Sequence, residues 1–441
     1  MKLKPYPKYM PSGLEWLGDL PAHWKIVPLK HVLVDMESGT SVNAIDVPAS
    51  SGEFGVLKTS CVYGGEFIAA ENKAVVPEEF DRVSCPLRRG TLIVSRMNTP
   101  ELVGAAGLVR RAEAGLFLPD RLWQVSFHDA EPAFAHYWTQ TAAYRVQVEM
   151  ACSGTSSSMQ NLSQGQFRSF AFPRPSVAEQ VAIAAYLDRE TAKIDTLIAK
   201  QEKLIELLQE KRQAVISHAV MKGLDPMVPM KPSGVAWLGD VPEHWEVGPI
   251  KRFFSFLDGK RVPLSAEERG VRAGDYPYYG ASGIIDSVDD YIFDEDLVLV
   301  SEDGANLLAR STPIAFVARG KYWVNNHAHV LKPVDEHLTY WSERIEAENL
   351  VPFVSGSAQP KLTIQALANI LIAVPPSANE RQEIEAYILS ESAKIGTLIA
   401  KAQQAIALQK EHRTALISAA VTGKIDVRGM VDQESYEEKA A

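Results

Sequence analysis

One stretch decides the fold because the chain contains it twice: residues 176–220 read SVAEQVAIAAYLDRETAKIDTLIAKQEKLIELLQEKRQAVISHAV, and residues 377–421 read SANERQEIEAYILSESAKIGTLIAKAQQAIALQKEHRTALISAAV. The two copies align without a gap at an offset of 201, and 23 of the 45 positions are identical. Such identity at a fixed offset indicates an internal duplication. The chain of 441 residues is therefore expected to consist of two repeats.

Each copy has the start and stop signals of one long helix. Residues 176–179 and 377–380 have the S-x-x-E spacing of a capping box, and the prolines just before them keep the preceding chain extended. Gly223 and Gly423 follow the last periodic residues and suit a left-handed C-terminal cap. The sequence predicts two helices of about 45 residues, each roughly 65 Å long.

Apolar residues recur along each predicted helix at near-heptad spacing. A helix of this length cannot bury its apolar stripe alone. We expect the two copies to pack antiparallel about a pseudo-twofold axis, the alternative being a stripe that serves a homodimer or another partner. The positions predicted to pack between the helices are Leu187, Ile194, Leu197, Leu204, Leu208, Ile388, Ile395, Leu398 and Leu408.

A second duplicated segment precedes each helix: PSGLEWLGDLPAHWKIVPLK at 11–30 and PSGVAWLGDVPEHWEVGPIK at 232–251, an offset of 221. Because this offset exceeds that of the helices by 20, the first intervening region is 20 residues longer than the second. Each segment carries two tryptophans, Trp16 and Trp24 in the first. They are expected to fix the segment to its domain by aromatic packing rather than to take part in catalysis.

The duplication predicts an α+β fold: two globular α/β domains separated by two long helices packed as an antiparallel coiled coil, with a pseudo-twofold internal repeat. The predicted segments are a first domain with the N-terminal frame (1–172), a central helix (173–224), a second domain (225–374), a C-terminal helix (375–427) and a flexible tail (428–441).

The bulk composition does not by itself favour a nucleic-acid-binding protein. The formal net charge is −10, whereas phosphate contacts need Lys and Arg. Residues 1–172 carry 16 basic and 17 acidic side chains, and residues 225–374 carry 13 and 21. Any contact with DNA would use local patches or the help of a more basic partner.

The sequence also bears on location. No run approaches the roughly 18–20 apolar residues of a membrane span, and the N-terminal residues lack the apolar core of a secretory signal. Cys61, Cys85 and Cys152 lie far apart without metal-ligand spacing. They are expected to be free thiols in a reducing cytoplasm.

The two intervening regions barely resemble each other, although both contain short apolar runs broken by Gly, Pro, Asn and Asp, which is typical of short strands and loops. LIVS at 92–95 can be aligned with VLVS at 298–301, and 153–164 with 355–365. A duplicated frame with diverged regions indicates two versions of one task.

Polar residues in the predicted loops could read bases, since Arg or Lys pairs with guanine and Asn or Gln with adenine. The alternative is that Ser, Asn and Gln merely form turns. The candidate DNA-contacting residues are Lys58, Arg96, Asn98, Thr155, Ser156, Gln160, Asn161, Lys260, Arg261, Tyr278, Tyr279, Asn306, Asn325, Asn326, Gln359 and Lys361.

The sequence predicts no self-sufficient active site. It lacks a G-x-x-x-x-G-K-[ST] phosphate loop and a G-x-S-x-G elbow. His327 and His329 in NNHAH have no further clustered ligands, so no metal site is expected. SEDG at 301–304 lacks the remaining spacing of a calcium loop and is expected to be a turn.

Taken together, these motifs resemble the DNA-specificity subunits of type I restriction–modification systems. The family's W-L-G-x-x-P-x-x-W segment, its P-P-x-x-E-Q helix entry and its I-D-x-L-I tag match residues 16–24 and 237–245, 175–180 and 376–381, and 194–198 and 395–399. Two departures, Arg381 for the usual Gln and Gly396 for Asp, are not expected to alter function. Gly396 costs up to about 1 kcal/mol of helix stability relative to Ala.

The resemblance implies a non-catalytic chain with two target-recognition domains. Each would read one half of an asymmetric bipartite site in double-stranded DNA, while the helix pair sets the spacer and docks two methyltransferase subunits. Restriction and translocation subunits would complete a complex with adenine-N6 methyltransferase and ATP-dependent endonuclease activities. The partners would use S-adenosylmethionine, ATP and Mg²⁺, with no cofactor bound by this chain.

Two other interpretations stay open at this stage. The chain could be a scaffold that binds proteins through its helices and never reads DNA, although diverged polar loops argue against this. It could also be an enzyme whose site combines SEDG at 301–304 with NNHAH at 325–329.

Overall fold

The structure is a computed structural model that describes residues 4–111, 113–156, 159–356 and 359–430, with the side chains of 153–156 outside this description. It divides into two compact units, the first formed by residues 1–201 with 404–441 and the second by residues 202–403. Each unit contains one sheet-rich domain and half of each long helix.

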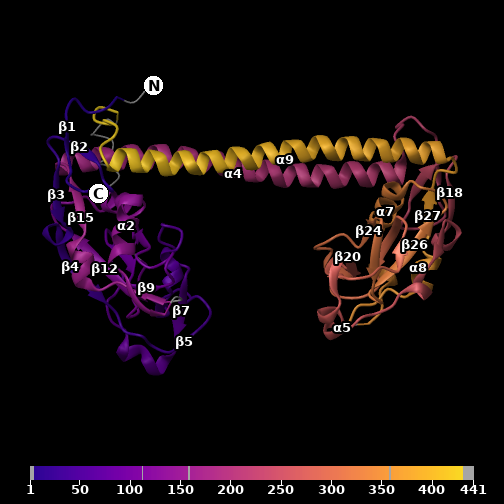
Figure 1. The fold of residues 1–441 in the computed structure, drawn as a ribbon, viewed down its shortest axis with the longest axis horizontal. Coiled ribbons are helices and arrows are strands. Elements are labelled where there is room, and N and C mark those ends of the chain that lie inside the picture. Colours follow the sequence, from indigo (N-terminus) through magenta and orange to yellow (C-terminus); the bar gives the residue numbers. More distant parts are fainter. Residues whose placement is uncertain (1–3, 112, 157–158, 357–358, 431–441) are drawn as a thin grey trace. The chain divides into compact units, whose positions relative to one another are not determined.

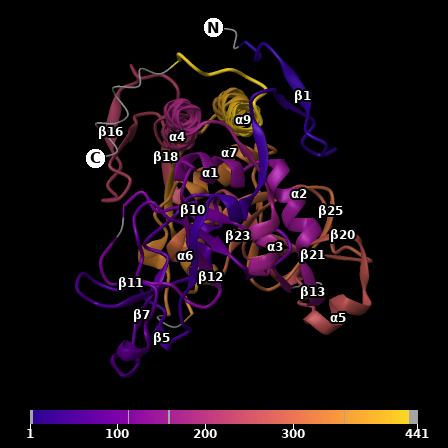
Figure 2. The same ribbon diagram turned by 90° about the vertical axis from the view of Figure 1, so that its left-hand side faces the viewer.

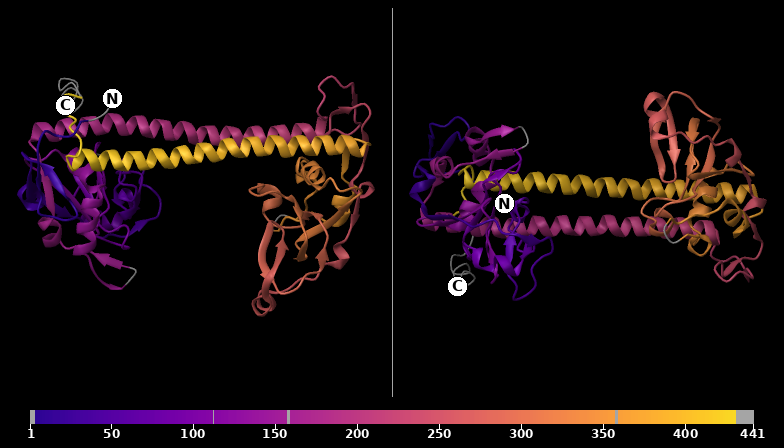
Figure 3. Two further views of the ribbon diagram at one scale, coloured as in Figure 1. Left: turned by 45° about the horizontal axis from the view of Figure 1, so that its top comes forward. Right: turned by 90° about the horizontal axis from the view of Figure 1, so that it is seen from below.

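The two long helices are α4 (Val177–Lys222) and α9 (Ala378–Val421), and they run antiparallel in both units (Figures 1–3). In the first unit the start of α4 and the end of α9 share one core, which includes Leu187 and Ile417. In the second unit the end of α4 and the start of α9 share another, which includes Val220 and Ile384. The predicted helix pair and α+β fold class are confirmed.

Fewer positions along the two helices are buried than the sequence predicts. Five predicted positions lie in the buried row, at most 9% exposed, and most are spaced by multiples of seven: Leu187, Ile194, Leu208, Ile388 and Ile395. The structure corrects the prediction at Leu197, Leu204, Leu398 and Leu408, which are 45%, 43%, 50% and 64% exposed. Half-buried positions such as Ile198 and Ile205 alternate with this row at spacings of three and four residues, so Leu197 and Leu204 lie one residue outside the stripe and face solvent.

The start of each long helix is held by the duplicated segment that precedes its domain, residues 11–30 or 232–251, which we call the frame. Glu179 accepts the indole N–H of Trp24 at 3.1 Å, and Glu380 accepts that of Trp245 at 2.8 Å. The Ser176 hydroxyl accepts the Glu179 N–H at 3.3 Å, as the capping box predicts. Trp24 and Trp245 are buried and have the structural role expected of them, whereas Trp237 is 46% exposed and contacts only the Phe353 ring among the aromatic pairs of the described residues.

Both helices end as predicted, and the departures from the family pattern are accommodated. Gly223 and Gly423 have φ values of +81° and +69°, the left-handed conformation that glycine adopts readily. Arg381 donates to the Pro375 carbonyl at 2.5 Å and to Asp335 at 2.8 Å. Gly396 lies within α9 without interrupting it.

In its described residues, the domain of the first unit contains three sheets and three α-helices. One antiparallel sheet has the order β10 (Ala106–Leu108), β8 (Leu92–Ser95), β12 (Leu122–Phe127), β4 (Leu33–Ser38), and a second has β11 (Leu116–Phe117), β6 (Gly55–Leu57), β7 (Asn72–Val75), β5 (Ala44–Ile45). The third sheet is β13 (Ser153–Ser156), β14 (Met159–Asn161), β9 (Met97–Asn98). The helices are α1 (Pro132–Thr139), α2 (Ala142–Ala151) and α3 (Gln164–Ser169).

The domain of the second unit has a related arrangement. Its first sheet has the order β19 (Phe254–Phe256), β26 (Ala328–Pro333), β23 (Leu297–Ser301), β24 (Ala315–Ala318). The other sheet has the order β21 (Gly283–Val288), β20 (Ala273–Gly280), β25 (Lys321–Val324), β22 (Phe293–Asp294). The helices are α5 (Ala266–Val271), α6 (Asn306–Ala309), α7 (Leu338–Glu346) and α8 (Ile364–Asn369).

Short strand pairs repeat between the units and connect each domain to its long helix. β3 (Lys25–Pro28) pairs with β15 (Ala171–Arg174), and β18 (Glu246–Pro249) pairs with β27 (Leu371–Val374) in the same antiparallel manner. β1 (Tyr9–Pro11) with β2 (Asp19–Pro21) and β16 (Met230–Pro232) with β17 (Asp240–Pro242) form the other matching pairs. The duplicated segments thus fold into duplicated structure.

Two further predictions concern the described part of the chain. None of its helices is long and apolar enough to cross a membrane. Cys61, Cys85 and Cys152 are free thiols, as predicted. Burial raises the pKa of Cys61 to about 12, with a smaller contribution from Glu71, so this thiol stays protonated and unreactive.

Candidate nucleic-acid interface

In the first domain, the end of β8 meets the strand that leads into α3. The Leu162 N–H donates to the Arg96 carbonyl at 2.9 Å, and β9 pairs with β14 so that Asn98 lies opposite Gln160. We call residues 95–98 with 160–162 the first crossing point. It gathers Arg96, Asn98, Gln160 and Asn161, four of the candidate DNA-contacting residues.

In the second domain, the end of β23 meets the segment that leads into α8, and an isolated bridge between Asp303 and Lys361 keeps the same register. The Leu362 N–H donates to the Glu302 carbonyl at 2.8 Å, and the Gly304 N–H donates to the Pro360 carbonyl at 3.0 Å. We call residues 301–304 with 360–362 the second crossing point. The sequence alignment of LIVS with VLVS anticipates this correspondence.

The local sequence explains why polar side chains gather at both points. The strands β8 and β23 are buried throughout and end at Ser95 and Ser301, after which the chain leaves the core and its residues turn polar. The returning segment is fixed by the next short helix. The Ser163 hydroxyl accepts the Gln166 N–H at 3.3 Å, and the Thr363 hydroxyl accepts the Ala366 N–H at 3.2 Å.

The first crossing point is made mainly of neutral amides and hydroxyls. The Asn98 side-chain amide donates to the Tyr63 hydroxyl at 2.9 Å and to the Ser95 hydroxyl at 3.2 Å. Among the described residues, Arg96 Nε and Asn161 Oδ1 are buried and have no hydrogen-bond partner. Buried polar atoms in proteins are usually hydrogen-bonded, so these two atoms are exceptions within this domain.

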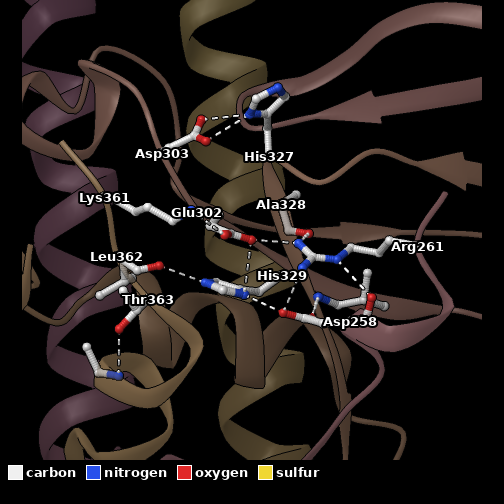
Figure 4. A network of polar contacts seen from close by, with 12 residues as sticks. Asp258, Arg261, Glu302, Asp303, His327, Ala328, His329, Lys361, Leu362 and Thr363 are labelled. Carbon is white, nitrogen blue, oxygen red and sulfur yellow. Dashed lines mark hydrogen bonds and ion pairs between the residues drawn. The ribbon is translucent and has the colours of Figure 1, made fainter. Parts of the chain in front are cut away.

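The second crossing point instead rests on a buried ionic network (Figure 4). His329 is 1% exposed, with Nδ1 at 2.6 Å from Asp258 and Nε2 at 2.8 Å from the Leu362 carbonyl. Arg261 lies 3.2 Å from Asp258 and 2.7 Å from Glu302. The network therefore fixes both strands of the crossing point.

Neighbouring charges and hydrogen bonds lower the pKa values of the two carboxyl groups of this network, Asp258 and Glu302. Burial alone raises the pKa of the Asp258 carboxyl, but hydrogen bonds from His329 and a backbone N–H, with the charge of Arg261, hold that pKa below its usual range. Burial also raises the pKa of Glu302. The hydrogen bond from Arg261, the charge of His329 and the hydrogen bond from Lys361 outweigh it, so the net shift is downward. Both groups are therefore ionised at neutral pH.

Three residues of this network have the donor groups of a metal site. Asp258, Glu302 and His329 offer ligand atoms that lie within 4.8 Å of one another. The Arg261 guanidinium already contacts both carboxylates, however, and both ring nitrogens of His329 have protein partners. A metal ion would have to displace Arg261 and compete with these bonds, so the donor set does not fit a metal. The cluster supports the fold of the crossing point.

Two side chains at the edge of the network reach solvent. His327 lies 2.8 Å from Asp303 and its side chain is 45% exposed, while Lys361 lies 3.2 Å from Glu302 and is 51% exposed. The sequence predicts Lys361 but not His327. Strand alternation could not have found His327, because it would place this residue on the face of Asn325 and His329, which are both buried.

The remaining candidates fall into two groups by exposure. Those that are exposed are Lys260, Asn326, Gln359 and Lys361, and those that are half-buried include Lys58, Arg96, Gln160, Asn161 and Tyr279. Lys58 is paired with Asp46 at 3.2 Å. The side chains of Thr155 and Ser156 lie outside the described residues.

Five candidates are corrected, because their polar groups are used inside the protein. Tyr278 is a core residue, 0% exposed, with its hydroxyl bonded to the Leu264 N–H at 2.9 Å. Asn98 and Asn325 are 8% and 4% exposed. Asn306 is bonded within its own loop, to the Thr312 carbonyl at 3.0 Å, and Arg261 belongs to the ionic network.

Comparison with known proteins extends these observations. The family model for the type I restriction modification DNA specificity domain matches residues 242–408. A Haemophilus influenzae protein assigned as a type I restriction enzyme specificity subunit is 33% identical over 29% of this chain and 32% of its own length. The type I restriction enzyme MjaVIII specificity subunit of Methanocaldococcus jannaschii is 25% identical over 60% of this chain and 64% of its own length. The chain therefore matches about a third to two thirds of these relatives.

Solved structures share the fold. A chain from a structure of a type I R-M system has a TM-score of 0.59 at 17% identity, covering 91% of this chain and 98% of its own. The HsdS subunit of Thermoanaerobacter tengcongensis has a TM-score of 0.51 at 17% identity, covering 92% and 98%. These structures show the shared fold, and the family model and the relatives confirm the resemblance predicted from the sequence.

Proposed function

Because this chain carries a type I restriction modification DNA specificity domain and is similar to specificity subunits, we propose that it is the DNA-recognition subunit of a type I restriction–modification complex. One observation carries the proposal: two crossing points share a backbone register but present different side chains. Two readers of one design with different surfaces suit a bipartite, asymmetric target.

We propose that each domain reads one half-site through the loops at its crossing point. Arg96, Gln160 and Asn161 in the first domain, and Asn326, Gln359 and Lys361 in the second, are side chains suited to base edges. His327 joins this second group. With a net charge of −10, the chain would supply discrimination, while partner subunits supply most phosphate contacts.

We propose that the helix pair sets the spacer between the half-sites and docks two methyltransferase subunits on its two related surfaces. α4 and α9 are uninterrupted over 46 and 44 residues, as a fixed-length element requires. Methylation of adenine and ATP-dependent cleavage would belong to the partners, which would bind S-adenosylmethionine, ATP and Mg²⁺ in the cytoplasm. The chain alone would then show neither methyltransferase nor nuclease activity.

A helix insertion tests this proposal. Four residues added within 199–203 lengthen α4 by about one turn, or about 5.4 Å, which corresponds to one or two base pairs. Methylation mapping in cells that hold the partner subunits should show a spacer longer by one or two base pairs between unchanged half-sites. The matched control adds four residues after the exposed loop residue Gly52 and should leave the spacer unchanged. An unaltered spacer in the helix variant would refute the role of the helices.

A further inference from the structure

The two units use the same frame where each long helix begins. His23 lies 3.0 Å from Glu179 in the first unit, and His244 lies 2.9 Å from Glu380 in the second. Seven residues after this glutamate, or about two helical turns, each helix carries a tyrosine at the matching position: Tyr186 in α4 and Tyr387 in α9. The two frames therefore offer the same groups to whatever covers them.

In the first unit, the segment that follows α9 covers this frame. Figure 2 shows this segment, in yellow, passing over the ends of α9 and α4. Val427 is 0% exposed, and the Arg428 guanidinium lies 4.9 Å from the centre of the Tyr6 ring and 4.0 Å from Glu179. Arg189 of α4 donates to the Met430 carbonyl at 2.8 Å. The tail predicted to be flexible from residue 428 thus begins with residues that pack against the first unit.

In the second unit the matching groups are open. Tyr387 is 39% exposed, against 6% for Tyr186. The Glu380 side chain is 27% exposed, against 4% for Glu179. Met227 takes the place of Tyr6 in the duplicated sequence and is 85% exposed rather than packed on the frame.

Chain connectivity explains this difference. In the first unit two segments meet on the frame, the one entering β1 and the one leaving α9, and they are joined by a bridge between Lys4 and Asp426. In the second unit α4 runs directly into β16, so one segment, 223–229, stands where the first unit has two. The position of the second segment is left as a groove.

The groove consists of two adjoining pockets that share Gly223 and Leu224. One, of about 380 Å³, is lined on its acidic side by Asp225, Glu380 and Glu383. Lys222, the cation of this pocket, donates to the Asp240 carbonyl. The other pocket, of about 430 Å³, is more apolar and is lined by Tyr387, with Lys211 and His218 as its basic residues.

We infer that this groove binds an extended segment of a partner protein in which an apolar residue is followed directly by an arginine. The first unit supplies the template, since Val427 and Arg428 occupy the matching place with an apolar contact and a cation between a carboxylate and an aromatic ring. In the second unit Glu380 matches Glu179, and Glu383 adds a second carboxylate. Met227 stands in place of the Tyr6 ring, so the ring that lines the groove is Tyr387, the counterpart of Tyr186 on the helix. The chain's own segment is already used by the first unit, so a partner must provide this one. The inference goes beyond DNA recognition and does not depend on it.

The test uses a fluorescently labelled peptide with the sequence of residues 424–430, KIDVRGM, titrated with the full chain. Saturable binding in the range of about 10 µM to 1 mM is expected, because the peptide is short and flexible. Glu383→Lys and Tyr387→Ala should each weaken binding about tenfold or more. The same peptide with its arginine replaced by glutamate should not bind.

Matched controls separate the groove from other causes. Glu411→Lys makes the same charge change at an exposed position of α9 in the first unit and should leave binding unchanged. Glu383 is exposed, so its variant should fold even if Tyr387→Ala does not, which circular dichroism checks. Absence of saturable binding, or binding that neither groove variant weakens, would overturn the inference. Self-association that Glu383→Lys abolishes would also overturn it, because the occupant would then be a second copy of this chain.

Discussion

The first and second crossing points share the register of their backbone hydrogen bonds but differ in the side chains that surround them. In both, the N–H of the residue before the helix cap donates to a carbonyl just beyond the buried strand, from Leu162 to Arg96 and from Leu362 to Glu302. Around the first, the contacts are neutral amides and hydroxyls. Around the second, Asp258, Arg261, Glu302 and His329 form an ionic network. The frame fixes the register and leaves the side chains free to diverge.

The two crossing points also differ in the interactions that stabilise them. A buried charge is stable only when its partners are complete, so the second crossing point depends on every member of its network. The first depends on amide hydrogen bonds, each of which contributes less. Substitutions at matched places should therefore have unequal costs, and three experiments can sharpen or break this contrast.

The largest effect is expected at the ionic network. Asp258→Ala removes the acceptor of His329, Arg261 and the Val330 N–H at once and leaves Glu302 as the one remaining carboxylate of this buried network. We expect a loss of about 3–5 kcal/mol in the free energy of unfolding, measured by urea denaturation. Hydrogen exchange should localise the loss to the second domain.

The control for this experiment is Asp303→Ala, whose partner His327 is 45% exposed. The Asp303 side chain itself is 13% exposed. We expect its loss to cost about 1 kcal/mol, since one hydrogen bond to a solvent-exposed partner is removed. Equal losses in the two variants would show that the buried network is no more important than a surface pair.

A smaller effect is expected at the first crossing point. Asn98→Ala leaves the Tyr63 and Ser95 hydroxyls and the Thr99 N–H without their amide partner. We expect a loss of about 1–3 kcal/mol by the same measurement, because only neutral hydrogen bonds are lost. A loss as large as that of Asp258→Ala would remove the contrast between the two points.

The smallest effect is a difference in pH dependence. The folded-state pKa values of Asp258 and Glu302 are lowered, so these groups stabilise the fold fully above their usual values near 4. This stability is lost as the pH falls through the lowered folded-state values, by an amount on the order of 1 kcal/mol. Urea unfolding between pH 7 and pH 3 should show a shallower pH dependence for Glu302→Gln than for the unaltered chain. Parallel curves would contradict the assignment.

The sequence was sufficient for the parts of the fold that are duplicated. Identity at a fixed offset predicts the helix pair, and capping signals predict where each helix starts and ends, as Gly223 and Gly423 confirm. It was insufficient where burial depends on tertiary contacts. Leu197 and Leu398 have the spacing of a packed stripe, but the partner helix covers only the neighbouring row, leaving them 45% and 50% exposed.

The candidate DNA-contacting residues show the same limit, because their exposure depends on tertiary contacts that the local sequence does not specify. Tyr278 and Tyr279 are adjacent in one strand, so alternation puts them on opposite faces, and nothing local says which face is core. The structure buries Tyr278 and leaves Tyr279 half-exposed. Likewise, whether an asparagine is free depends on its partners, and Asn325 accepts a bond from the His327 N–H at 2.8 Å while Asn326 is exposed.

The most direct test of the central claim exchanges the first reader alone. Residues 31–162, which contain the first crossing point, would be replaced by the corresponding residues of a relative with a different target. The methylated sequence would then be mapped across the genome of cells that hold the partner subunits. We predict that one half-site changes while the other half-site and the spacer stay the same. A change in both half-sites, or in neither, would contradict the assignment of one half-site to each domain.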